Sequence, residues 1–394
     1  MSYLPRDIET QLKTAAGHFP AVILTGPRQS GKTTLLKHLF LKTHAYVSLD
    51  DPGIRLMAAK EPALFFENFK PPLIIDEVQY APQIFPYLKL IIDKKRKIRG
   101  NFILTGSQLF PLMAGVSESL AGRAALFTLL SFSLLERSRG KNEFSFNRLK
   151  RLLFSGGFPD AALSAPKLLN TWFSSYIQTY LERDVRQLRQ VGDLSDFQRF
   201  LQLIAAVNGQ ILNLSSVSRD LGVAVNTIKA WISILEASGQ VFLLKPFYIN
   251  KGKRLVKNPK LYFLDTGLLN YLLGLESSGQ VFKGPAAGQM LETAALGEII
   301  RKAYNNGQLP RVYYWRTSYG EEVDFIIEER TKLVPVEIKL SANISAAAAK
   351  AAVSFIDLFP EKVDKGYVVS FSEANVRLTD KIQAVSFSDF VNRK

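Results

Sequence analysis

The sequence predicts an α/β protein made of several successive units, and three observations support this prediction. A glycine-rich loop joins an apolar strand to a helix within residues 21–40. Short apolar strands then alternate with helical segments up to about residue 130, the order typical of a parallel sheet covered by helices on both faces. Residues 291–371 instead show a helix, three strands, a helix and a strand, which predicts a second sheet.

The composition describes a folded and strongly basic chain. Of its 394 residues, 47% are hydrophobic, and 50 Lys and Arg outnumber 35 Asp and Glu, for a formal net charge of +15. Such an excess predicts an acidic polymer, above all DNA, as a partner. The chain has no cysteine, which excludes disulfides, cysteine zinc sites and a cysteine nucleophile. No run approaches the about 20 apolar residues of a membrane span, so we expect a soluble, cytoplasmic protein without membrane contact.

The stretch AVILTGPRQSGKTTLLKHLF contains the most specific pattern in the chain. Gly-x-x-x-x-Gly-Lys-Thr follows an apolar strand and opens a helix, which is the setting of a phosphate-binding loop. Backbone N–H groups of such a loop surround the phosphates. We expect Lys32 to reach the β- and γ-phosphates of ATP and Thr33 to bind Mg²⁺. The predicted nucleotide-binding residues are Gly26, Pro27, Arg28, Gln29, Ser30, Gly31, Lys32, Thr33 and Thr34.

A second apolar strand, PLIIDEVQ at residues 72–79, ends in two acidic residues. Asp76 suits a second contact to Mg²⁺ through water, and Glu77 suits polarisation of the water that attacks the γ-phosphate. An acidic strand end that merely faces solvent is the alternative interpretation.

A third apolar strand, NFILTGSQ at residues 101–108, ends in Thr105 and Ser107. It resembles the sensor strand that related ATPases place between the other two. We favour Ser107 as the sensor of the γ-phosphate, with Thr105 nearly as suitable. The remaining strands are expected at 45–50 and 125–130.

Arg123 follows a turn of small residues in the stretch SLAGRAALF. A P-loop ATPase without its own arginine finger borrows one from a neighbouring subunit. Arg123 is therefore a candidate finger, which would require an oligomer. An ordinary surface or interface arginine is an equally good interpretation.

The middle of the chain predicts a helical connector followed by a winged helix. Residues 171–190 form a long amphipathic pattern, and residues 213–247 resemble a helix-turn-helix with Gly222 in the turn. Strands at 241–248 and 260–267 would form the wing. Two roles of this winged helix stay open: it contacts DNA phosphates, or it only packs between domains. The candidate nucleic-acid residues are Lys229 of the second helix and Lys251, Lys253, Arg254 and Lys257 of the wing tip.

The stretch EEVDFIIEERTKLVPVEIKL predicts a β-hairpin. If Glu328 pairs with Leu333, Asp324 lies opposite Glu337, with Cβ atoms about 5 Å apart. Alternation along the strands then puts Asp324, Glu337 and Lys339 on one face. Two opposed carboxylates repel each other, and a divalent metal such as Mg²⁺ between them would relieve the repulsion.

Asp324, followed thirteen residues later by Glu337-x-Lys339, resembles the PD-(D/E)xK nuclease signature. In that signature two acids hold Mg²⁺ and the lysine positions or activates water. Glu292 or Glu298, on the helix predicted at 291–304, resembles the helix glutamate of the junction-resolvase branch. A retained fold without chemistry, or a simple pairing of Glu337 with Lys339, is the alternative.

The motifs LTGPRQSGKTTL, LIIDEVQ, ILTGSQ, GGFPDA and YYWRTSYGEEVDF…PVEIK together resemble bacterial and archaeal AAA+ ATPases. In that family the ATPase is fused to a C-terminal domain of unknown function with a restriction-endonuclease-like fold. The resemblance spans about residues 3 to 390 and implies ATP hydrolysis, a homo-oligomer with a hexamer as one candidate, and a link to DNA. The predicted units are an AAA+-type P-loop ATPase domain with a parallel sheet at 1–150, a helical lid or connector at 151–205, a winged helix at 206–275 and an α/β restriction-endonuclease-like domain at 280–394.

The sequence thus favours an ATP-hydrolysing protein that uses ATP and Mg²⁺ to process or remodel DNA, branched DNA included. It would act as an oligomeric motor with a nuclease-like C-terminal domain. Two alternatives stay open: a nucleotide-controlled regulatory switch, and a protein-remodelling ATPase whose nuclease-like domain is inactive.

Overall fold

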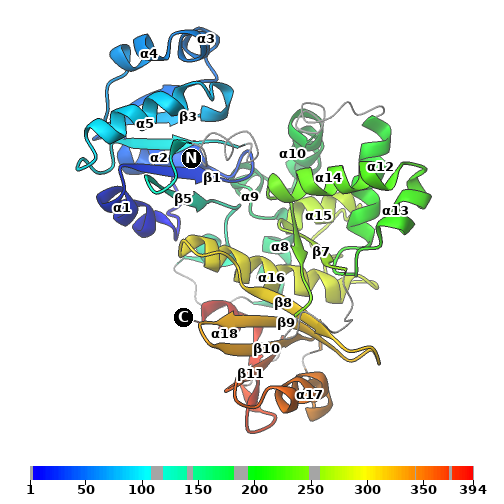
Figure 1. The fold of residues 1–394 in the computed structure, drawn as a ribbon. Coiled ribbons are helices and arrows are strands. Elements are labelled where there is room, and N and C mark those ends of the chain that lie inside the picture. The colour runs from blue at the N-terminus through cyan, green and yellow to red at the C-terminus, as the bar shows by residue number, and fades with distance from the viewer. Residues whose placement is uncertain are drawn as a thin grey trace.

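A parallel sheet of five strands organises the N-terminal part of the computed structural model (Figure 1). The structure describes residues 3–107, 119–139, 145–181, 194–247, 258–341, 343–371 and 375–393. In spatial order the strands are β2 (Ala45–Ser48), β3 (Leu73–Asp76), β4 (Phe102–Thr105), β1 (Ala21–Thr25) and β5 (Ala124–Thr128). Because β4 lies between β3 and β1, the predicted place of the sensor strand is confirmed.

Helices cover both faces of this sheet, which is why its strands are nearly continuous apolar runs. Side chains alternate along β1: Val22 and Leu24 face one apolar cluster, while Ala21 and Ile23 face the other. The helices are α1 (Glu9–His18) and α2 (Lys32–Phe40) on the first face, and α3 (Pro52–Lys60), α4 (Pro62–Asn68) and α5 (Ile84–Lys94) on the second.

The middle of the chain is mainly helical. Its elements are α7 (Leu134–Ser138), α8 (Phe146–Ser155), α9 (Pro159–Leu163), α10 (Leu169–Tyr176), η3 (Ile177–Leu181), α12 (Leu194–Ala206), α13 (Leu214–Leu221), α14 (Val225–Ala237), β6 (Val241–Leu244), β7 (Lys260–Phe263) and α15 (Thr266–Leu272). The helix predicted over 171–190 begins as α10 and turns into the π-helical η3; the rest lies outside the described residues.

Helices α13 and α14 lie where the sequence predicts a helix-turn-helix, and they contact each other. Gly222 ends α13 in the left-handed conformation, with φ of 72°, which glycine adopts at little cost. Ile228, Trp231 and Leu235 of α14 are buried. Strands β6 and β7, which the sequence assigned to a wing, pair antiparallel.

A mixed sheet of six strands forms the C-terminal part, in the order β12-β13-β11-β10-β9-β8. Strands β8, β9 and β10 pair antiparallel, whereas β11 runs parallel to both β10 and β13. Glu328 pairs with Leu333, which confirms the predicted register of the hairpin. The elements are α16 (Ala287–Asn305), β8 (Val312–Arg316), β9 (Glu322–Glu329), β10 (Lys332–Ile338), α17 (Lys350–Leu358), β11 (Gly366–Ser370), β12 (Val376–Arg377), β13 (Ile382–Ser386) and α18 (Phe387–Asn392).

The long helix α16 lies between the N-terminal domain and the C-terminal sheet (Figure 1). One apolar core continues through the middle and C-terminal parts, from Leu130 to Val391. The boundaries between the four predicted units stay predictions. In the part of the chain that the structure describes, no helix is both long and apolar enough to cross a membrane.

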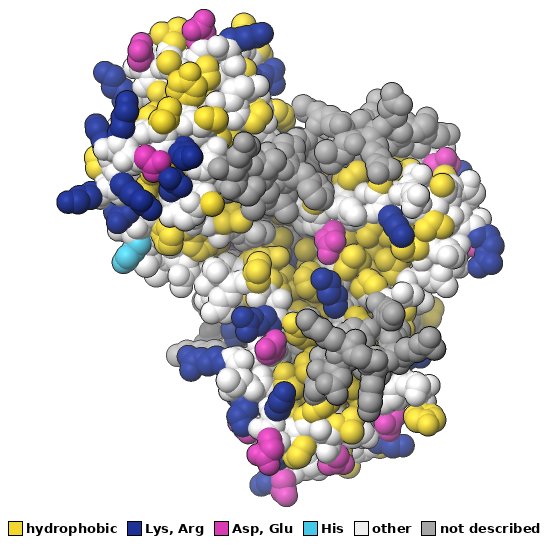
Figure 2. Space-filling view, viewed as in Figure 1, with side chains coloured by type: hydrophobic (Ala, Val, Ile, Leu, Met, Phe, Trp, Pro, Cys, Tyr) yellow, Lys and Arg dark blue, Asp and Glu magenta, His cyan; other side chains and the backbone are white. Residues whose placement is uncertain are grey.

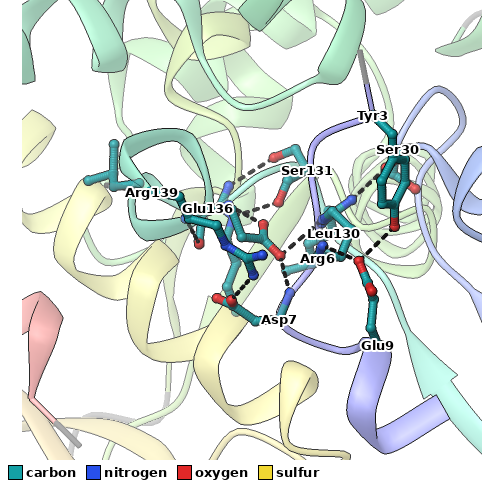
Figure 3. Close-up of polar contacts among 12 residues, drawn as sticks. Tyr3, Arg6, Asp7, Glu9, Ser30, Leu130, Ser131, Glu136 and Arg139 are labelled. Atoms are coloured by element: carbon teal, nitrogen blue, oxygen red, sulfur yellow. Dashed lines mark hydrogen bonds and ion pairs between the residues drawn. The ribbon is translucent and has the colours of Figure 1, made fainter. Parts of the chain in front are cut away.

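A buried polar junction ties the N-terminal domain to α16 (Figure 3). Arg6 donates from Nη1 to the Ser30 carbonyl at 3.0 Å and from Nη2 to the Leu130 carbonyl at 2.7 Å. Its Nε pairs with Glu136 at 3.0 Å, and both side chains are almost fully buried. Arg6, which precedes α1, is therefore bonded to the loop after β1, to the segment after β5 and to α7.

The same junction continues into α16 through Glu298. Both Glu298 oxygens accept from the Leu134 N–H at 3.1 Å, which places the carboxylate at the start of α7. Arg301 lies 3.6 Å from Glu298 and donates to the carbonyl and the hydroxyl of Ser131. Burial raises the pKa of Glu298 to about 7.

Candidate nucleotide and carboxylate sites

The loop between β1 and α2 has the shape of a phosphate cradle. Gly26 has φ of 138°, and a Cβ there would lie 2.1 Å from the Leu129 carbonyl oxygen, so only glycine fits. Gly31 has φ of 90° directly before α2. Lys32 Nζ donates to the carbonyls of Gly26 and Pro27 at 3.0 and 2.8 Å. The Ser30 hydroxyl is buried without a hydrogen-bond partner in the described residues, as suits a polar group that faces a ligand.

Thr33 and Asp76 lie together at the mouth of this loop. The Thr33 hydroxyl donates to Asp76 Oδ2 at 2.8 Å, and the Tyr46 hydroxyl donates to the same oxygen at 2.8 Å. Asp76 Oδ1 is buried and has no hydrogen-bond partner among the described residues. A hydroxyl beside a carboxylate with a spare oxygen fits Mg²⁺, so these two side chains would hold the ion.

Glu77 and Ser107 meet at the ends of β3 and β4. The Ser107 hydroxyl donates to Glu77 Oε2 at 2.9 Å, and the Gln79 amide donates to the same oxygen. Glu77 has φ of 53°, an uncommon conformation that recurs at functional sites. The Thr105 hydroxyl is buried without a partner in the described residues. Contact with Glu77 favours Ser107 over Thr105 as the sensor, which stays a prediction.

Two residues of this site were missing from the sequence prediction. Tyr46 comes from β2, and Gln79 comes from the turn after β3. The only sequence signal for Gln79 was its place two residues after Glu77. Tyr46 could be predicted only if the pairing of β2 with β3 was already known.

Arg123 lies at the N-terminal end of the parallel strands, whereas the phosphate loop of the same subunit lies at their C-terminal end. It directly precedes β5, and its carbonyl accepts from the N–H of Ala21, the first residue of β1. A strand of five residues, about 16 Å, therefore separates it from the loop. Its guanidinium pairs with Asp93 through two hydrogen bonds of 2.8 and 2.9 Å. Arg123 cannot reach the nucleotide of its own subunit, and a role in a neighbour stays a prediction.

The middle region covers the phosphate loop. Gln240 donates to the Tyr176 hydroxyl at 2.9 Å, and that hydroxyl lies 3.4 Å from the Arg28 carbonyl. A Cβ on Gly239 would lie 2.9 Å from the Pro27 ring. The turn after α14 is thus in close contact with the loop that would bind phosphate.

Asp324, Glu337 and Lys339 converge on the face of the hairpin that the sequence predicted. Asp324 Oδ2 accepts from the Ile338 N–H at 2.7 Å, and Lys339 Nζ pairs with Glu337 Oε2 at 2.7 Å. Glu337 Oε1 is buried with no partner in the described residues. Burial, and then repulsion from Asp324, raises the pKa of Glu337 to about 8, and burial raises the pKa of Asp324 as well.

Glu292 joins this carboxylate site, whereas Glu298 belongs to the junction described above. Burial, and then repulsion from Asp324, raises the pKa of Glu292 to about 8. The Tyr262 hydroxyl donates to Glu292 at 3.1 Å. Of the two helix glutamates that the sequence left open, Glu292 therefore faces the hairpin.

Four further residues around the carboxylate site were missed: Lys260, Tyr262, Arg316 and Glu322. Lys260 is buried and pairs with Glu322, which also lies 3.2 Å from Arg316. Alternation along β7 turns Lys260 and Tyr262 to the same side, toward β8 and β9. The site thus has walls from the middle region as well as from the C-terminal sheet.

The carboxylates fit a single divalent ion held by two acids. Asp324 and Glu337 repel each other, and one Glu337 oxygen lacks a partner, so these two side chains would hold Mg²⁺. Over the described ranges, no three His, Asp or Glu side chains are close enough together to hold a metal ion by themselves. Water or backbone oxygen would supply the other ligands.

Of the predicted nucleic-acid residues, the structure describes Lys229, which is exposed on α14. The remaining four, Lys251, Lys253, Arg254 and Lys257, lie outside the described residues. The flanks of this segment are held against the C-terminal sheet, because Phe247 N–H donates to the Tyr314 carbonyl at 2.7 Å and the Tyr314 hydroxyl donates to the Asn258 carbonyl at 2.7 Å.

The phosphate loop, the Thr33–Asp76 pair and the order of the parallel sheet together define a P-loop ATPase domain of the AAA type. Residues 18–138 match the family model described as AAA domain. Residues 146–279 and 287–390 match two family models that are each described as a domain of unknown function.

The relatives with similar sequences have no described activity. Uncharacterized proteins of Mycobacterium bovis and Mycobacterium tuberculosis are each 29% identical over 382 residues, which covers 96% of this chain and 83% of theirs. An uncharacterized protein of Haemophilus influenzae is 24% identical over 277 residues, which is 67% of this chain and 64% of that protein.

Solved structures resemble the chain only distantly. The Walker-type ATPase of Pyrococcus abyssi is 14% identical, covers 68% of this chain and 96% of its own, and has a TM-score of 0.47. The RuvB Holliday junction branch migration motor of Thermotoga maritima is 18% identical, covers 60% and 88%, and has a TM-score of 0.31. Both scores are below 0.5, so neither likeness supports an argument about function.

Proposed function

We propose that the protein hydrolyses ATP to process or remodel DNA, with branched DNA among its substrates, and that its C-terminal site is a metal-dependent nuclease site. One observation carries the proposal: Asp324, Glu337 and Lys339 meet Glu292 in a buried site. The C-terminal part that carries this site has the element order helix, three strands, helix and strand. This is the element order of restriction-endonuclease-like domains. The net charge of +15 suits the phosphates of DNA.

Each residue of the nucleotide site has its own role in ATP hydrolysis. Lys32 balances the charge of the β- and γ-phosphates, while Thr33 and Asp76 would hold Mg²⁺, which would supply further positive charge there. Glu77 orients the attacking water and takes its proton. Ser107, 2.9 Å from Glu77, holds that carboxylate in place.

The carboxylate site suits hydrolysis of a phosphodiester bond. Mg²⁺ there would lower the pKa of a bound water and stabilise the leaving oxygen. Asp324 and Glu337 supply its ligands, and Lys339, which is partly exposed, positions the water. Glu292 and Tyr262 form the wall behind these two acids.

The assembly and the DNA contacts belong to the same proposal. The subunits form a homo-oligomer, a hexamer among the candidates, in which Arg123 serves the nucleotide of a neighbour. The wing tip, with Lys251, Lys253, Arg254 and Lys257, contacts the phosphate backbone of DNA, and Lys229 extends that surface.

Steady-state ATP hydrolysis tests the proposal. The rate is measured without DNA and with single-stranded, duplex and four-way-junction DNA, at low and at moderate salt. We expect at least one form to raise the rate, more strongly at low salt because phosphate contacts weaken as salt increases. A rate that no DNA form changes would refute the proposal.

A nucleotide-controlled switch is the second candidate, and the contacts of Gly239 and Tyr176 with the phosphate loop favour it. Bound nucleotide would then set the position of the winged helix without turnover on DNA. This candidate predicts slow hydrolysis and different DNA affinities with ADP and with a non-hydrolysable ATP analogue. Equal affinities in the two states would count against it.

A further inference from the structure

A strongly basic loop starts at the last residue of α5, runs toward β4 and has no part in either site described above. Its sequence is KKRKIR, residues 94–99. All five cations of the loop are exposed, and none of them pairs with an acidic side chain in the described residues. Asp93, which directly precedes the loop in the sequence, is paired with Arg123. Figure 2 shows Lys and Arg side chains gathered on this edge of the N-terminal domain, at the left of the view.

The loop is held in one conformation by its backbone. Ile98 N–H donates to the Lys95 carbonyl at 2.9 Å, and Gly100 N–H donates to the Phe19 carbonyl at 2.8 Å. His44 Nε2 lies 2.7 Å from the Gly100 carbonyl. Gly100 has φ of 62°, and a Cβ there would lie 2.8 Å from a backbone oxygen. The cations are therefore presented by a fixed turn, which lowers the entropy lost on binding.

A hollow of about 500 Å³ lies beside the loop and combines basic with apolar walls. Lys95 and Arg99 line it, together with Pro71, Pro72 and Ile98. None of the described residues that line it is acidic. Other hollows of the molecule differ in this respect, because carboxylates line both the hollow beside β6 and the one beside α16.

Two groups in the hollow decide which atoms are available to a ligand. Both nitrogens of His44 are engaged, by Thr43 and by Gly100, so this ring is not a contact. The Asn101 side chain is only 7% exposed, and it makes no hydrogen bond within the described residues. An amide and two cations therefore face the hollow, a combination suited to phosphate oxygens.

We infer that this loop and its hollow bind the phosphate backbone of DNA, as a second contact surface apart from the wing. The inference rests on the proposed function and names where its substrate is held. Five exposed cations, two of which line the hollow, give the charge complementarity to phosphates. The surface lies a strand length, about 16 Å, from the phosphate loop of the same subunit, so DNA on this surface does not overlap the ATP of that subunit.

Charge reversal in the loop tests the inference. The variant K94E/K95E/K97E changes three exposed side chains, and its matched control, K60E/K167E/K350E, changes three exposed lysines that lie elsewhere. Binding of fluorescent single-stranded DNA is measured by anisotropy from low to moderate salt. Three lost phosphate contacts should lower the slope of log K against log salt by about 2, and the affinity about 100-fold at 0.1 M salt.

The control should lose far less affinity, although its net charge is the same. A second variant, K95Q/R99Q, removes only the two cations that line the hollow and should bind about 25-fold more weakly at 0.1 M salt. ATP hydrolysis without DNA should be unchanged in all three variants, which shows that the ATPase domain is folded.

The outcomes separate this inference from the proposed function. If the wild type binds DNA and the loop variant loses no more affinity than the control, the loop is not a DNA surface, while the proposed function stands. If the wild type binds no DNA form, both fail. If the loop variant loses binding to vesicles of anionic lipid but keeps its DNA affinity, the loop faces a membrane and the inference is wrong.

Discussion

Arg6→Ala tests the buried junction between the N-terminal domain and α16. The guanidinium is 5% exposed and makes three hydrogen bonds, one to a carboxylate and two to backbone carbonyls. Hydrogen bonds to charged groups contribute about 1.5–3 kcal/mol each, and breaking a buried ion pair costs about 3–5 kcal/mol. Glu136 keeps its bonds from the N–H groups of Asp7 and Ser133, which limits the loss. We expect the free energy of unfolding to fall by about 4 kcal/mol.

Urea denaturation, followed by tryptophan fluorescence and by circular dichroism, measures this change. Arg139→Ala is the matched control, because Arg139 pairs with Asp7 at the surface, where both side chains are about 40% exposed. That pair should contribute less than about 1 kcal/mol. Arg6→Lys keeps the charge but cannot span three acceptors, so its stability should lie between those of the wild type and the alanine variant.

The same variant should weaken ATP binding, because Arg6 holds the Ser30 carbonyl within the phosphate loop. Loss of about 1 kcal/mol corresponds to an affinity about fivefold lower. If Arg6→Ala costs no more stability than Arg139→Ala, the junction does not hold the two parts together and the reasoning is refuted.

Three further predictions concern single residues. Lys32→Ala should reduce ATP hydrolysis to background because the phosphates lose their countercharge, and persistent turnover would show that the loop binds no nucleotide. Asp324→Asn should leave ATP hydrolysis intact and abolish Mg²⁺-dependent DNA cleavage; unchanged cleavage would place that chemistry elsewhere. Burial raises the pKa of Glu298 from 4.5 to about 7, so the folded state binds the extra proton and the free energy of unfolding should fall by about 3 kcal/mol as pH rises through this window. Glu298→Gln should flatten that pH dependence in urea titrations, and an equally steep profile in the variant would exclude Glu298 as its source.

Local patterns predicted the elements of the fold well. The strand-to-helix setting of the phosphate loop follows from a few adjacent residues, and the hairpin register followed from alternation around one short turn. Both are contacts between near neighbours in the sequence, where periodicity fixes the geometry.

The contacts between distant segments could not be predicted in this way. Glu292 and Glu298 lie on one helix but six residues apart, so they face different sides, and only tertiary packing decides which one meets Asp324. Arg6 and Glu136 are 130 positions apart. Lys260 precedes its partner Glu322 by 62 positions, and no periodic pattern links the two.

The position of Lys260 and Tyr262 on β7 has a consequence for the modularity of the chain. The family model that covers residues 287–390 begins after both, yet they pair with Glu322 and Glu292 inside that range. A fragment cut at the family boundary would keep the carboxylates and lose the buried cation and the hydroxyl that offset them. Recombination at this boundary would therefore transfer an incomplete site.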